Sequence, residues 1–135
     1  MHVRMAPEAF TGRLILWLLA FCTLTSGCRP GAADLTASWS IEPSPPVAGT
    51  PTTVRFTLQR DARIPVTGAR LRLEAHMAHP GMAPVTAEPV EQAHGTYVGR
   101  VNLTMGGDWI FVMTGELPDG SRFTEQIDVR GVREN

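Results

Sequence analysis

Hydrophobic and polar side chains alternate with a period of two along most of the chain beyond residue 35. The alternation is clearest in residues 53–59 and 70–77, where one face carries Val54, Phe56, Leu58, Leu71, Leu73, Ala75 and Met77. This period is typical of a β-strand with one face on a core and the other in solvent. Five further segments show it, with Pro89 marking one of them as an edge strand: 36–42, 85–90, 96–104, 108–115 and 121–130.

Turn residues separate these segments. Pro118-Asp119-Gly120 stands between two alternating runs and predicts a hairpin. Seven short strands and no helix in this part of the chain predict an all-β fold, an immunoglobulin-like two-sheet antiparallel sandwich. A closed eight-stranded barrel is the alternative, but seven strands fit the sandwich better. Glu125 falls on the inward face of the last strand, which indicates a bulge or a solvent-facing rim there.

The N-terminal segment has a different pattern. Arg4 and Arg13 precede an entirely apolar run, Leu14–Leu24, which small residues follow. Eleven apolar residues suit the core of a secretory signal but fall short of the roughly 20 that a membrane-spanning helix needs. The run has no polar face, which argues against an amphipathic helix packed on a core.

The sequence Leu24-Thr25-Ser26-Gly27-Cys28 is similar to a bacterial lipobox, whose Cys is lipidated and becomes the new N-terminus. Thr25 stands where such motifs usually carry Leu, so an ordinary cleaved signal is the alternative. We expect a lipoprotein signal in residues 1–27 with Cys28 lipidated, a flexible tether in 28–35 and one β-sandwich domain in 36–132. Cys22 would be removed with the signal, so no thiol would remain for a disulfide or a thiolate metal site.

Charge and composition exclude several functions. The 12 basic residues, all Arg, nearly balance 13 acidic ones, for a formal charge of −1. Nucleic-acid binding needs a clustered basic excess, so we expect no nucleic-acid partner. The absence of Lys excludes Schiff-base and P-loop chemistry. No nucleophile elbow, paired carboxylates at a Gly-rich turn or zinc-protease helix motif is present, and we expect no enzyme.

Imidazole and thioether side chains gather in one short segment. The sequence from residue 76 to 85 reads HMAHPGMAPV, with His76, Met77, His79 and Met82 within seven positions. Thioether sulfur with imidazole nitrogen suits Cu(I), and imidazole alone suits Cu(II) or Zn(II). Calcium and magnesium are poor candidates because the segment carries no carboxylate. Copper is therefore the expected metal, with Cu(I) favoured over Cu(II).

Strand parity adds one more donor. In successive antiparallel strands every second loop lies at the same end, so the loop with His79 and Met82 should share an end with Met105, and His94 should lie at the other. Alternation turns Met77 into the core and His76 outward. We rank His76, His79 and Met82 first as ligands, Met105 next and Met77 last.

Each of these residues also has a structural interpretation. Methionines often fill gaps in cores, and Met113 is best explained in that way. The site and this plainer interpretation have comparable support from the residues alone. Tyr97, after Gly95-Thr96, is similar to the tyrosine of such sandwiches whose hydroxyl bonds nearby backbone, and Asp108 is expected to accept a hydrogen bond in a turn.

Three stretches of the chain together resemble the YtkA-like domain, which is related to the FixH family. They are residues 76–85, Gly95-Thr96-Tyr97 and residues 105–109 (MGGDW). The resemblance implies a β-sandwich outside the cytoplasmic membrane, often anchored to it. It also implies association with cation pumps or with the assembly of haem-copper oxidases. FixH proteins usually keep a transmembrane helix, whereas this chain carries a lipobox-like segment.

Two functions follow as hypotheses. The first is a monomeric, lipid-anchored extracytoplasmic protein that captures copper on a His/Met loop and passes it to a receiving protein. The second is a metal-free interaction or assembly module, such as a FixH-like accessory of a cation pump or oxidase, whose exposed loop docks on a partner. Both hypotheses place the protein outside the cytoplasm, on the periplasmic side of a bacterial membrane.

Overall fold

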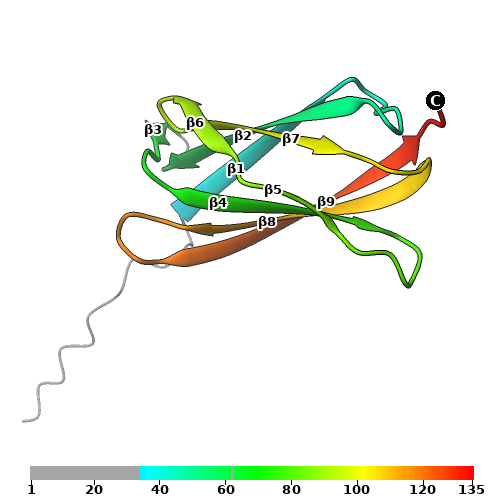
Figure 1. Cartoon of the computed structure of the whole chain (residues 1–135). Helices are drawn as coiled ribbons and strands as arrows, with labels where there is room; N and C mark the ends of the chain where they lie inside the picture. Colours follow the sequence, from blue (N-terminus) through cyan, green and yellow to red (C-terminus); the bar gives the residue numbers. More distant parts are fainter. Residues whose placement is uncertain (1–33, 62) are drawn as a thin grey trace, which may run out of the picture.

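The computed structural model describes residues 34–61 and 63–135. This part of the chain folds into two antiparallel sheets, which confirms the predicted all-β sandwich (Figure 1). Within the described ranges no helix is long and apolar enough to cross a bilayer. The strands are β1 (Leu35–Glu42), β2 (Pro51–Arg60), β3 (Ile64–Pro65), β4 (Arg70–Met77), β5 (Val85–Ala87), β6 (Val90–Ala93), β7 (Thr96–Asn102), β8 (Gly107–Glu116) and β9 (Arg122–Val132).

Each sheet has a simple order. The first sheet runs β1-β2-β7-β6, with the short β3 added to β2, and the second runs β5-β4-β8-β9. The chain therefore passes repeatedly between the sheets. The predicted hairpin at Pro118-Asp119-Gly120 joins β8 to β9, and its turn is closed by a hydrogen bond of 2.8 Å from Leu117 N to Ser121 O.

The strand count is where the prediction was incomplete, because residues 34–61 and 63–135 form nine strands instead of seven. Residues 85–90 were expected to be one edge strand, but residues 85–87 form β5 and Val90 begins β6, which belongs to the other sheet. Pro89 lies between them without an N–H to donate, and it is buried close to Gly99, where a Cβ would lie 3.1 Å from Pro89 Cγ. The strand β3 was not predicted, since two residues are too few to show a period.

Aromatic side chains join the two sheets at the core. Trp109, Tyr97, Phe56 and Phe111 are almost fully buried. The ring of Phe56, from the first sheet, meets Trp39 edge-on at 4.7 Å between centroids and stacks at 6.1 Å on Phe123 of the second sheet. Such pairs stabilise a core beyond the area that they bury.

Three expectations for single residues are confirmed or refined. The Tyr97 hydroxyl donates to Val66 O (2.8 Å) and accepts from Ala69 N (3.0 Å), as expected for a tyrosine corner. Asp108 accepts a hydrogen bond from Gly131 N at 3.0 Å. Glu125 is half-exposed on the edge strand β9, opposite Met113, so it forms a rim; the bulge of this pairing lies between Gly107 and Trp109 instead.

Thr52 gives a first testable prediction. Its Oγ1 atom is buried without a hydrogen-bond partner among the described residues. An unpartnered buried hydroxyl costs stability, so we expect Thr52→Val to raise the free energy of unfolding by about 1 kcal/mol in urea titrations. Thr53→Val, on the outer face of the same strand, is the control and should change it by less than half of that. A loss of stability in Thr52→Val would show that the hydroxyl is hydrogen-bonded.

Candidate functional site

Three loops and the C-terminal residues lie at one end of the sandwich, called here the loop end (Figure 1). The loops are residues 43–50, 78–84 and 103–106. They meet because Pro51 pairs with Asn102 and Met77 pairs with Trp109, so β2, β7, β4 and β8 have matching ends here. The loop with His79 and Met82 and the loop with Met105 therefore share an end, as strand parity predicted. His94 lies at the opposite end, in the β6–β7 turn.

The 103–106 loop is held by three contacts at its base. Met105 O accepts a hydrogen bond from Trp109 Nε1 at 3.1 Å, and Gly106 N donates to Glu134 Oε1 at 2.8 Å. Leu103 O accepts from Gly49 N at 2.8 Å. The backbone on both sides of Met105 is thus fixed, while 43% of the residue's surface remains exposed.

The 78–84 loop continues β4 beyond the strand pairing. Ala78 N donates to Asp108 O at 3.0 Å, which ties the start of the loop to the start of β8. His79 and the residues that follow it are exposed, with Met82 at 45%. Met77, just before the loop, is half-buried against the core. Its Cε lies beside Gly107, where a Cβ would be only 3.6 Å away. The alternation had predicted this inward direction.

His76 points to the other face of β4. Its Nε2 lies 3.1 Å from Glu74 Oε2, and Glu74 Oε1 accepts from Arg72 Nε at 2.9 Å. The hydrogen bond from Arg72, and then that from His76, lower the pKa of Glu74 below its usual value. The structure therefore separates the five predicted ligands: Met77, His79, Met82 and Met105 belong to the loop end, while the ring of His76 is paired on the outer face of the second sheet.

The donor atoms at the loop end determine which metal ion could bind there. In the ranges 34–61 and 63–135 no three His, Cys, Asp or Glu side chains gather closely enough to hold a metal ion. A metal here would depend on the thioethers of Met77, Met82 and Met105 with the imidazole of His79 as the nitrogen donor. A sulfur-rich set of this kind suits Cu(I) far better than Zn(II), Ca²⁺ or Mg²⁺.

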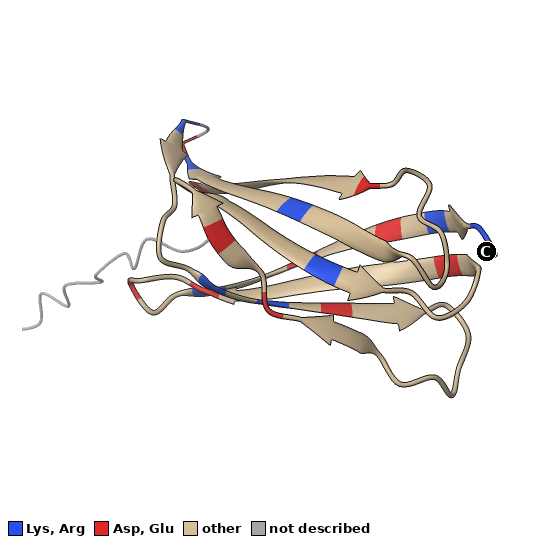
Figure 2. Cartoon of the chain, turned by 45° about the horizontal axis from the view of Figure 1, so that its top comes forward, with Lys and Arg blue, Asp and Glu red and all other residues tan. Residues whose placement is uncertain are grey.

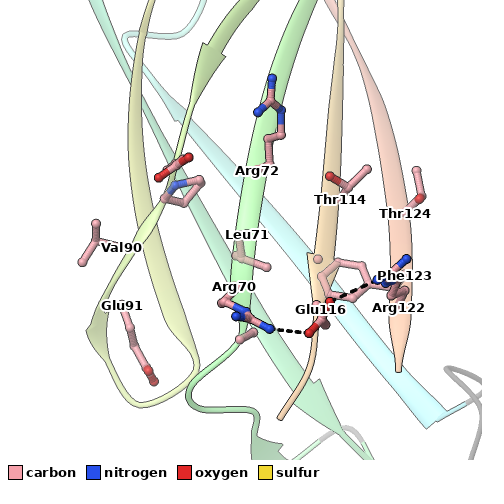
Figure 3. Close-up of a pocket in the computed structure, with 14 residues that line it drawn as sticks. Arg70, Leu71, Arg72, Val90, Glu91, Thr114, Glu116, Arg122, Phe123 and Thr124 are labelled. Atoms are coloured by element: carbon pink, nitrogen blue, oxygen red, sulfur yellow. Dashed lines mark hydrogen bonds and ion pairs between the residues drawn. The ribbon is translucent and has the colours of Figure 1, made fainter. Parts of the chain in front are cut away.

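A hollow of about 740 Å³ lies towards the opposite end of the second sheet (Figure 3). Three of the charged side chains that line it pair with one another, because Arg70 and Arg122 both contact Glu116. The bond from Arg70, followed by the contact with Arg122, lowers the pKa of Glu116. The three residues stand in one row across β4, β8 and β9. The sequence analysis missed this row, although outward positions on three paired strands are the signal that points to it.

Glu91 ties two loops together and gives a second prediction. Its two oxygens accept hydrogen bonds from Gly68 N (2.9 Å) and Gly95 N (3.0 Å), and these bonds lower its pKa. A lowered folded-state pKa stabilises the protein at pH values above the unfolded-state pKa of about 4.5. This stabilisation is lost as the pH falls through the folded-state pKa. We therefore expect the folded state to lose stability progressively below about pH 5.

Urea unfolding from pH 7 to pH 3 measures this effect. Glu91→Gln should flatten the acid part of the profile and lower the stability at pH 7, because an amide carries no charge to strengthen these bonds. Glu88→Gln removes the same charge from an exposed neighbour and is the control. Parallel profiles for the wild-type chain and Glu91→Gln would rule out this role of Glu91.

Comparisons with known proteins place the chain in a family. The fold is similar to the crystal structure of a DUF4426 family protein from Pseudomonas aeruginosa PAO1, with a TM-score of 0.57 and 10% identity, over 76% of this chain and 94% of that one. At such low identity the likeness shows the fold alone. No curated protein matches the chain. The sequence model of the YtkA-like family matches residues 32–114, more than half of the chain, and the protein therefore belongs to the YtkA-like family.

Proposed function

We propose that this protein is an extracytoplasmic copper-binding accessory protein, anchored by a lipid on Cys28, that captures Cu(I) at the loop end and passes it to a receiving protein. Membership of the YtkA-like family is compatible with an accessory role. The lipobox-like sequence before Cys28, which lies outside the described residues, supports the anchor. The metal is cargo in this proposal, so no catalytic residues are assigned.

One observation carries the proposal: two exposed methionines on different loops lie at the same end of the sandwich. Met82 and Met105 are among only four large hydrophobic residues exposed in the described chain. Exposed thioethers gain little from packing, whereas as ligands they bind soft Cu(I). His79 precedes Met82 by three residues in the same loop and adds a nitrogen donor. Met77 is the last residue of β4, just before this loop.

The strand directions support a role in delivery. Leu35 begins β1 opposite Arg60, at the end of the sandwich away from the loop end. The eight residues of β1 span about 26 Å at the usual rise of a strand. A lipid on Cys28 would hold the Leu35 end near the membrane, so the loop end would face outwards, within reach of a copper-receiving protein or the outer part of a cation pump.

A second function is a metal-free docking module for such a pump or an oxidase assembly factor. The observation in its favour is the shape of the 78–84 loop, which extends past the strands (Figure 1) and carries an exposed Met82 between Pro80 and Pro84. Exposed methionines also adapt to protein partners.

A Cu(I) titration of the full chain against a competing chelator separates the two functions. Cys22 and Cys28 are replaced with Ser in every chain that is titrated, because free thiolates would bind Cu(I) themselves. The copper proposal predicts that the chain withdraws one equivalent of Cu(I), and that the triple variant His79→Ala, Met82→Ala, Met105→Ala does not. Failure of the wild-type chain to withdraw copper would eliminate the proposal and leave the docking module. Uptake that is unchanged in the triple variant would place the metal elsewhere.

A further inference from the structure

The outer face of the first sheet has an unusual charge distribution. Alternation turns every second residue of β1, β2 and β7 to this face, and most of these side chains are Thr, Ser, Gln, Asn or Val. Glu42 is the acidic residue among these outward positions, and it stands at the end of β1. The basic ones are Arg55 on β2 and Arg100 on β7, and Figure 2 shows the basic positions of the strands in blue.

Arg55 and Arg100 are close neighbours across the strand pair. Arg55 stands opposite Val98 and Arg100 stands opposite Thr53, so the two arginines are diagonal neighbours. Diagonal positions of this kind are about 7–8 Å apart, within the reach of long side chains. Both arginines line one open hollow of about 510 Å³, together with Thr53, Val98 and two residues of β6, Val90 and Gln92.

Neither guanidinium group forms an ion pair among the described residues, although Glu42, opposite Thr53, is a diagonal neighbour of Arg55. The described strands contain seven arginines, and five of them form ion pairs: Arg60, Arg70, Arg72, Arg122 and Arg130. Within the described part of the chain, Arg55 and Arg100 form none. Two like charges side by side repel each other, and an anion between them would remove that cost.

We propose that Arg55 and Arg100 bind a phosphate monoester at this hollow, a site separate from the loop end and independent of copper. A phosphate monoester carries nearly two negative charges and three terminal oxygens, enough to accept hydrogen bonds from both guanidinium forks. A carboxylate has two oxygens and satisfies only one fork. The Thr53 hydroxyl and the Gln92 amide are further donors in the lining, and the exposed Val90 offers an apolar surface to the organic part of the ester.

The test is an NMR titration of the full chain that follows the arginine Nε–H and backbone amide signals in 0.1 M salt, where weak non-specific attraction is screened. The probes are inorganic phosphate, glycerol 3-phosphate, dihexanoyl phosphatidic acid and dihexanoyl phosphatidylcholine, all below micelle-forming concentrations. The proposal predicts saturable shifts around Arg55, Val98 and Arg100 with the first three probes and none with phosphatidylcholine. Tighter binding of phosphatidic acid would identify the ligand as a lipid headgroup, and equal binding of the monoesters would identify it as a soluble ester.

Variants decide whether the two arginines are responsible. Arg55→Gln and Arg100→Gln should each weaken phosphate binding about tenfold or more, since each removes charge-assisted hydrogen bonds. Arg130→Gln removes the same charge from β9 on the other sheet and should leave binding unchanged. Equal losses in all three variants, or no saturable shift with any phosphate probe, would overturn the proposal. Binding of a hexaglutamate peptide without binding of phosphate would also overturn it and would indicate an acidic protein partner.

Discussion

Replacing Met82 and Met105 together with Ala, in a chain whose Cys22 and Cys28 are Ser, is expected to lower the Cu(I) affinity by at least about 100-fold. Replacing residues that only support the ligands of a metal already lowers its affinity by up to about 100-fold, and here two of the proposed ligands themselves are removed. Both side chains are exposed, so the free energy of unfolding should change by no more than about 0.5 kcal/mol. Chelator competition measures the first quantity and urea unfolding the second.

Met113 supplies the matched control, because it is fully buried in the core away from the loop end. Met113→Leu removes a thioether while keeping a similar volume, so Cu(I) affinity should not change. His76→Ala should also leave the affinity unchanged, because the His76 ring is paired with Glu74 on the outer face. A loss of affinity in His76→Ala equal to that of the methionine variants would mean that β4 turns His76 towards the loop end when copper binds.

Gly95→Ala is expected to be the most destabilising of the substitutions considered, by about 3 kcal/mol or more. Gly95 has a φ of +72°, and a Cβ at this position would lie 2.8 Å from Leu58 O and 2.9 Å from Pro65 Cβ. The left-handed backbone costs an alanine about 1–2 kcal/mol, and forcing apart packed neighbours costs about 1–3 kcal/mol more.

Gly120 allows the two costs to be separated. It also has a positive φ, of +80°, but a Cβ there would meet no atom of the described residues within 4 Å, apart from its chain neighbours. Gly120→Ala should therefore show only the backbone cost, about 1–2 kcal/mol. Urea unfolding of both variants measures the difference. Equal losses in the two variants would show that the β6–β7 turn relaxes freely and that Gly95 is not tightly packed.

Most strands were predictable because each has one face on the core. The period of two in β2, β4, β8 and β9 reports that burial directly, and it also placed Met77 and His76 on opposite faces. The division of residues 85–90 between two sheets was not predictable, because it depends on Pro89 packing over Gly99 of the following strand, β7, once β6 and β7 have paired. A proline in the sequence indicates an interruption but not the sheet to which the chain then passes.

The candidate site was predictable only in part. Strand parity placed Met82 and Met105 at the same end. This placement held although residues 85–93 form two strands, because β5 and β6 run in the same direction and so count as one in the alternation. The pairing of His76 with Glu74 could have been predicted from the sequence, because residues two apart on a strand share a face. The anchoring of the 103–106 loop by Glu134 was not predictable, because Glu134 lies 28 residues from Gly106 in the sequence and no local pattern joins them.

X-ray absorption at the copper edge of the Cu(I)-loaded full chain, with Cys22 and Cys28 replaced by Ser, tests the central claim most directly, because it then counts only thioether sulfur atoms bound to the metal. The account predicts a shell dominated by two or more thioether sulfurs with one imidazole nitrogen, and a loss of sulfur scattering when Met82 and Met105 are replaced with Ala. A first shell made of nitrogen and oxygen alone, unchanged in that variant, would contradict it.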